Sequence, residues 1–218
     1  NEVITTNTTN FRTDAYGNYR IGAKAATATS NLGDLTIGST AGSKISAATA
    51  AHVTVTSTIQ IDGALGSASV VIATGTSAKA AAALINGKTA DTGVTSSAKT
   101  EFDLTAFTAS TSYSLNITSN NTTAVAVSFT AGSSLATADG FSAAINAIND
   151  ASSKTGVTAK INAAGNGITL NNASGEDITI SINSGTGGLT IGGTATASSA
   201  SAVGTGELVF DSDKSFAV

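Results

Sequence analysis

Residues 141–182 read FSAAINAINDASSKTGVTAKINAAGNGITLNNASGEDITISI, and this stretch decides the fold. It opens with an apolar stripe at helical spacing, formed by Phe141, Ala144, Ile145 and Ile148. The stripe predicts a helix from about residue 137 to residue 150 with one buried side. From Thr155 onward the apolar residues alternate with polar ones, which is the period of a strand. Gly165-Asn166-Gly167 supplies residues that accept positive φ in a hairpin turn, so a β-meander is expected after the helix.

A second copy of the helix-to-strand pattern occurs earlier in the chain. Ile148-Asn149 is followed, after five residues, by Thr155-Gly156-Val157. In the same way Ile85-Asn86 is followed, after five residues, by Thr92-Gly93-Val94. Every matched position is offset by 63 residues (148 − 85 and 155 − 92). We interpret the match as an internal duplication.

The motif residues have structural roles in this interpretation. Asn86 and Asn149 each close a helix, where asparagine tolerates left-handed φ and caps exposed carbonyl groups. Gly93 and Gly156 provide the bend at which the next strand begins. We therefore expect scaffold residues, rather than ligand contacts, at these positions.

The predicted elements form two units with the order β-β-α-β-β, the second with one extra strand. In the first unit, residues 53–108, strands are expected at 53–61, 69–73, 93–99 and 102–107, with a helix at about 77–86. The second unit, residues 109–183, opens with a hairpin formed by 113–118 and 124–129. One helix laid on an antiparallel sheet gives a fold of the α+β class that is mostly β.

The two chain ends are predicted to share one β-rich domain. Leu35-Thr36-Ile37-Gly38 is echoed by Leu189-Thr190-Ile191-Gly192, and both lie outside the two units. Residues 1–52 and 184–218 are therefore expected to lie side by side, with the two units inserted between them. Within the second of these segments, the Ala/Ser-rich run 194–202 is expected to be a loop.

Composition argues against several classes of protein. The chain has 218 residues, no Cys, 11% charged residues and a formal net charge of −4. Without Cys, disulfides and Cys-based zinc or redox sites are impossible. The ten Lys and Arg residues are scattered singly, so no basic patch for nucleic acid or an anionic membrane is expected. No apolar run approaches about eighteen residues, so no membrane-spanning helix is expected.

No catalytic, cofactor or metal site is expected, and we expect no enzyme activity. His52 is the only histidine and has no Cys or second His with which to hold a metal. Asp211-Ser212-Asp213 starts like a calcium loop but lacks the Gly and the later Glu. Gly185-Thr186-Gly187-Gly188 is not followed by the Lys and Ser/Thr of a phosphate cradle. Glu176 and Asp177 are adjacent, and in a strand they point to opposite faces, which does not suit paired acid–base work.

The residues of the duplicated pattern also carry a family resemblance. Residues 142–159, from SAAINAIN to TGVTA, resemble the hook IN motif of bacterial flagellins and flagellar cap proteins. Residues 85–94 are similar to a more degenerate instance of that motif. GELVFDSDKSFAV, residues 206–218, resembles the strand that returns from the outer domains of a flagellin, and YRIGA, residues 19–23, is similar to the outgoing strand.

The resemblance implies a surface-exposed outer region of the flagellar filament subunit, with a structural and antigenic role. It implies that terminal helices outside this sequence build the filament core and contact other flagellin subunits. It also implies export to the extracellular filament without a cleaved signal peptide, and Ser and Thr residues open to O-linked sugars. No catalytic, cofactor-binding or metal-binding residue carries over from the family.

Two alternatives stay open at this point. The filament cap protein shares the motif and acts as an assembly chaperone at the filament tip. An adhesin repeat or carbohydrate-binding module, which would contact glycans or host surfaces, predicts an aromatic platform for stacking sugars, and the chain has three Tyr and seven Phe. For the isolated chain we expect a monomer, because no long amphipathic helix for core assembly is present.

Overall fold

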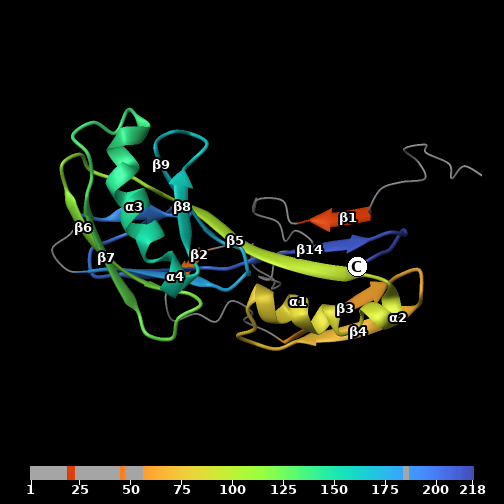
Figure 1. The fold of residues 1–218 in the computed structure, drawn as a ribbon. Helices are drawn as coiled ribbons and strands as arrows, with labels where there is room; N and C mark the ends of the chain where they lie inside the picture. Colours follow the sequence, from red (N-terminus) through yellow and green to blue (C-terminus); the bar gives the residue numbers. More distant parts are fainter. Residues whose placement is uncertain (1–18, 23–44, 48–55, 184–186) are drawn as a thin grey trace, which may run out of the picture.

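The protein has two apolar cores, spanned by one long strand (Figure 1). This computed structural model describes residues 19–22, 45–47, 56–183 and 187–218. Within these residues the strands form antiparallel sheets of seven, five and two strands, and the helices are few and short. The predicted mostly-β fold is confirmed at this level.

The long strand is β5, Thr95–Thr105, and it serves both cores. Ala98 packs against the first core, whereas Phe102 and Leu104 belong to the second. All three residues lie at even positions, so the alternation of the strand keeps one face inward along its length. Thr100, at the crossing between the cores, is fully buried. One continuous strand therefore holds the two cores in series.

The first core is enclosed by a hairpin, a helix and part of the seven-stranded sheet. At the start of α1 the Ser77 hydroxyl accepts a hydrogen bond from Ala80 N at 3.3 Å, as expected for an N-cap. Ile85, Leu208 and Phe210 are almost completely buried there. The elements are β1 (Tyr19–Gly22), β3 (Ser57–Asp62), β4 (Ser67–Ile72), α1 (Ala78–Asn86), α2 (Thr89–Thr92) and β14 (Glu207–Ser212).

The second core lies between the five-stranded sheet and the rest of the seven-stranded one. The helix α3 (Ser142–Asp150) contacts both β7 and β8, the end strands on that side, and so covers the opening between the sheets (Figure 1). The five-stranded sheet has the order β2 (Ile45–Ala47), β13 (Ser201–Gly204), β10 (Ile178–Ile182), β6 (Ser112–Thr118), β7 (Val125–Thr130). The facing strands are β8 (Thr158–Ile161), β9 (Gly167–Asn172), β11 (Leu189–Ile191) and β12 (Thr194–Thr196), and the remaining helical turns are η1 (Ala138–Phe141) and α4 (Ser152–Thr155).

Four aromatic rings pack together inside the second core. The Phe107 ring meets those of Tyr113 and Phe141 edge to face, with ring centroids 5.4 Å and 5.6 Å apart. Tyr113 stacks on Phe129 at 5.6 Å. The Tyr113 hydroxyl accepts a hydrogen bond from Thr108 N at 2.8 Å, so its polar end is satisfied inside the protein. These rings stabilise the core and are buried.

Several predicted elements are wrong. Residues 93–99 and 102–107 were expected to be two strands, but β5 is continuous because Thr100-Glu101 keeps the alternation and forms no turn. The expected β-meander also fails: β8 pairs with β9, but β10 pairs with β6 and β13 in the other sheet. The run 194–202, predicted as a loop, contributes β12 and the start of β13.

Strands from the two chain ends lie next to each other. β1 pairs with β14, and β2 pairs with β13. They also continue into the rest of the fold, since β14 pairs with β5 and β13 with β10. Leu35–Gly38 lies outside the described residues, and Leu189–Ile191 forms β11 beside β5. The division into domains 1–52 with 184–218, 53–108 and 109–183 stays a prediction.

Replacing Ile148 by Asp tests the second core. Ile148 is fully buried in that core, so the variant places a carboxylate where no water or partner is supplied. We expect the free energy of unfolding to fall by roughly 4 kcal/mol or more. The control is Asn146→Asp, an exposed position on the same helix, which is expected to stay within about 0.5 kcal/mol of the parent. Equal urea midpoints for the two variants would contradict the packing of α3.

Candidate functional site

The sequence motif forms a joint between helix and strand in the first core. Asn86 is the last residue of α1, and its side-chain amide lies against the backbone of Ser96 in β5. The Asn86 Nδ2 donates to Ser96 O at 2.8 Å, and Ser96 N donates to the Asn86 Oδ1 at 2.7 Å. The amide thus pairs with the strand as a neighbouring strand would.

The same joint occurs in the second core. The Asn149 Nδ2 donates to Ala159 O at 3.1 Å, and Ala159 N donates to the Asn149 Oδ1 at 2.8 Å. Both partners are shifted by 63 residues from the first joint (149 − 86 and 159 − 96). The expectation that each Asn caps the carbonyls of its own helix is wrong. The amide groups instead satisfy strand backbone groups that would otherwise lack a partner.

A threonine holds the turn that follows each helix. The Thr92 Oγ1 donates to Lys88 O at 3.0 Å and accepts from Val94 N at 3.2 Å. The Thr155 Oγ1 likewise donates to Ala151 O at 3.1 Å and accepts a hydrogen bond at 3.2 Å from the backbone N of the residue two positions later. Thr92 and Thr155 are both fully buried. They end α2 and α4, the two short helical turns that the sequence did not reveal.

Glycine makes the reversal between each turn and the next strand. Gly93 and Gly156 have φ of 74° and 72°, in the left-handed region that favours glycine. Val94 and Val157 then enter the two cores and are fully buried. We call residues 85–96 the first elbow and residues 148–159 the second elbow.

The ten predicted motif residues are thus brought together as two separate elbows. Each elbow uses one isoleucine and one valine in its core, one amide, one hydroxyl and one glycine. None of these side chains titrates near neutral pH. What they can do chemically is pack, pair with backbone groups and reverse the chain.

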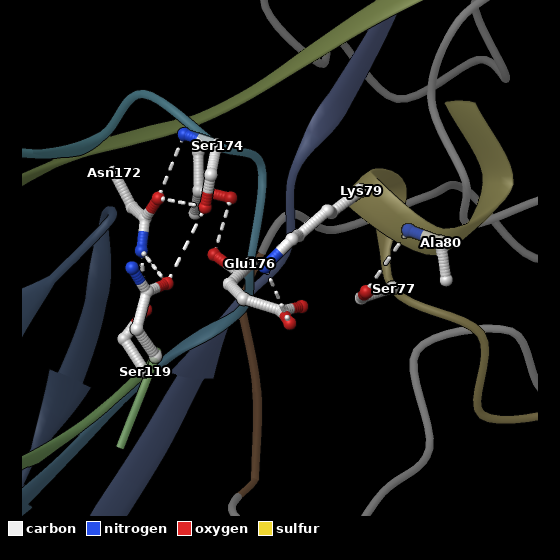
Figure 2. Close-up of polar contacts among 9 residues, drawn as sticks. Ser77, Lys79, Ala80, Ser119, Asn172, Ser174 and Glu176 are labelled. Carbon is white, nitrogen blue, oxygen red and sulfur yellow. Dashed lines mark hydrogen bonds and ion pairs between the residues drawn. The ribbon is translucent and has the colours of Figure 1, made fainter. Parts of the chain in front are cut away.

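A second group of polar contacts lies where the two cores meet, around residues 173–177 (Figure 2). We call this segment, which joins β9 to β10, the junction loop. Gly175 O accepts a hydrogen bond from Lys79 N, in the first turn of α1, at 3.0 Å. The buried Thr100 Oγ1 donates to Glu176 O at 2.7 Å, and the Lys79 ammonium lies 3.5 Å from the Glu176 carboxylate. The loop of one core thus caps a helix of the other.

The same loop is tied to the second elbow. The Asn172 side chain accepts from Ser174 N at 2.8 Å and donates to Ser119 Oγ at 2.7 Å and to Asn120 Oδ1 at 2.9 Å (Figure 2). Asn120 N in turn donates to Thr155 O at 3.0 Å. A run of hydrogen bonds therefore leads from the end of α4 to the start of α1.

Asp177 is the one group of the junction loop with a strongly shifted titration. Partial burial, together with the negative charge of Glu176, raises its pKa to about 7, although the backbone N–H of Gly206 opposes the shift. Sequence reasoning set Glu176 and Asp177 aside as unsuited to catalysis and missed their place at the junction. Only the adjacent acidic pair after an Asn-x-Ser turn could have drawn attention to it.

The other candidates from the sequence carry no site. Asp211 pairs with Arg20 at 2.7 Å across β14 and β1. Over the part of the chain that the structure describes, no group of three or more His, Asp and Glu residues could hold a metal. His52 lies outside the described residues, as do Gly185 and Thr186. No helix in the described ranges is long and apolar enough to cross a membrane.

Comparisons with known proteins add no identification. No protein-family model matches the chain, and no curated protein sequence matches it either. The interpretation of the elbows therefore depends on their own geometry and on the sequence motif.

Removing one elbow amide tests the pairing with the strand. We expect Asn149→Ala to lower the free energy of unfolding by about 1–3 kcal/mol, because Ala159 N and O lose their partner. Asn86→Ala is the parallel variant in the first elbow and should have an effect of the same size. The control Asn146→Ala, exposed on α3, should change little; urea denaturation showing three equal midpoints would contradict the joint.

Three glycines with nearly equal φ separate backbone strain from crowding. Gly165, with φ of 69° and open space around it, should lose only about 1 kcal/mol when changed to Ala. Gly93→Ala should lose a similar amount, since its neighbour is the exposed and adjustable Leu65 side chain. Gly156→Ala should lose about 1–3 kcal/mol more, because its Cβ would overlap the Asn120 side chain. An equal loss at all three positions, measured by thermal unfolding, would contradict this ranking.

Proposed function

We propose that this chain is the surface-exposed outer region of a bacterial flagellin, a structural subunit of the flagellar filament. The single observation that carries the proposal is the pair of elbows, with matched hydrogen bonds at an offset of 63 residues. They occupy the residues that resemble the hook IN motif. In this proposal the two elbows belong to two duplicated β-β-α-β-β units inserted in a β-rich domain made from both chain ends.

The order of elements supports the duplication. Residues 57–105 run β3, β4, α1, α2, β5, and residues 112–161 run β6, β7, α3, α4, β8. Within each series the hairpin precedes the helix, and the elbow precedes the next strand. The correspondence is not complete, since β5 is much longer than β8 and pairs with different strands. A duplication followed by divergence accounts for both the likeness and the difference.

The chemistry of the described residues suits a passive, structural part. The elbow residues supply packing and backbone pairing, and no step of a reaction is assigned to them. In the proposed setting the chain is carried on the outside of the cell, and other flagellin subunits contact it through helices beyond this sequence. Sugars on Ser or Thr, and contacts with host surfaces, belong to the same proposal.

The cap protein remains the main alternative, since it shares the motif. A carbohydrate-binding module is less well supported, because the four core rings Phe107, Tyr113, Phe129 and Phe141 are buried. Stacking of sugars needs aromatic faces at the surface.

Immunogold labelling of the source cells tests the proposal and separates the alternatives. Antibodies raised against the purified chain should decorate the flagellar filament along its whole length. Labelling of the filament tip alone would support the cap protein instead. Labelling of the cell body with bare filaments would contradict both and support an adhesin. Cells from which the gene is deleted are the control and should show no label.

A further inference from the structure

The two cores meet at a tightly packed crossing. The chain passes between them in β5 and again in the short link from β13 to β14. Gly206, in that link, has no room for a side chain: an added Cβ would lie 2.5 Å from Ala78 Cβ and 2.8 Å from Thr100 Oγ1. It would also lie 2.9 Å from Gly175 O, in the junction loop. Helix, strand, link and loop therefore meet at one point.

The junction loop is the part of this crossing held by side-chain and capping contacts alone. β5 and the β13–β14 link are continuous chain and cannot separate. The loop, by contrast, holds the first core through the Lys79 N–H, the Lys79 ammonium and Thr100. These contacts can break without disrupting any strand pairing, so the loop is the releasable contact between the cores.

Asp177 stands at the end of the loop, where it accepts a hydrogen bond from the backbone of Gly206. The charged groups on the elements around it are Glu176 in the loop, Lys79 on α1, Lys99 and Glu101 on β5, and Glu207 on β14. Glu207 is almost fully buried, and Lys99 already faces Glu101 at 3.6 Å. An ionised Asp177 would therefore add negative charge to a partly buried site that is already acidic.

We propose that the junction loop is a proton-operated latch, which holds the two cores in one orientation while Asp177 is protonated and releases them when that carboxyl ionises. On release the proton passes to solvent water, and the carboxylate moves out to be hydrated. The cores then turn relative to each other about β5 and the link at Gly206. The latch does not depend on the proposed place of the chain in a filament.

Linkage sets the pH range of the effect. In the latched state the pKa of Asp177 is raised from the ordinary value of 3.8 to about 7. In the released state the hydrated carboxyl returns to about 4. The ratio of released to latched molecules should therefore rise roughly tenfold per pH unit between about pH 4 and pH 7, and stay level above that. The whole change is about a thousandfold.

Distance measurements between the cores test the latch. The chain has no Cys, so Leu84→Cys on α1 and Ala126→Cys on β7, both exposed, accept spin labels at two unique positions. Electron–electron distance distributions should be narrow near pH 4 and gain a second population as the pH rises to 7. The same labelled chain with Asp177→Asn should stay narrow throughout. A distribution that does not change with pH, or a change that persists in Asp177→Asn, would overturn the proposal.

Two further variants guard against a trivial outcome. Glu176→Gln removes the neighbouring negative charge, so the pH at which the second population levels off should move below 7. An unmoved pH in this variant would count against the latch, even if Asp177→Asn does not fold. Asp91→Asn, an exposed acid on α2, is the matched control and should leave the response unchanged. Asp177 acting on stability alone would alter the melting temperature with pH but leave the distance unchanged.

Discussion

The pairing of an asparagine amide with strand backbone is the interaction on which this fold depends most. At Ser96 one edge of β5 faces β14, while β9 pairs with the other edge only from Thr100 onward. Asn86 supplies one donor and one acceptor at that open edge, as a strand would. Asn149 does the same for Ala159, whose other side is paired with β9. An exposed strand edge is thereby closed, and a helix is fixed to its sheet.

This fixing is needed because the helices bury little apolar surface. The inward side of α1 consists of Ala78, Ala81 and Ala82, with Ile85 as the one large side chain. Buried alanines contribute little to the hydrophobic stabilisation of a helix, and a helix of nine residues is marginal by itself. Polar joints at the helix end therefore carry part of the stability that a larger core would supply. The low aromatic content of the chain is consistent with such thin cores.

Local patterns in the sequence predicted the parts of the fold that depend on neighbouring residues. The helix after Ser77, the hairpin of β6 and β7, and the left-handed glycine after each threonine follow from caps, alternation and turn chemistry. What failed depended on distant partners. The path of β10 into the opposite sheet is decided by pairing with β6 and β13, and nothing within residues 173–177 marks that change. The bond from Asn149 to Ala159 was hidden for the same reason, since local rules offered only a helix cap.

The junction loop shows a further limit of local reasoning. Its contacts come from α1, β5, the β6–β7 turn and the β13–β14 link, which are far apart in the sequence. Under the proposed duplication, each elbow is inherited with its unit and recurs at a constant offset. A contact between the two units has no such counterpart, because it can exist only once the second copy is present. Lys79, Thr100 and Asp177 are thus where two similar units acquire a property that neither has by itself.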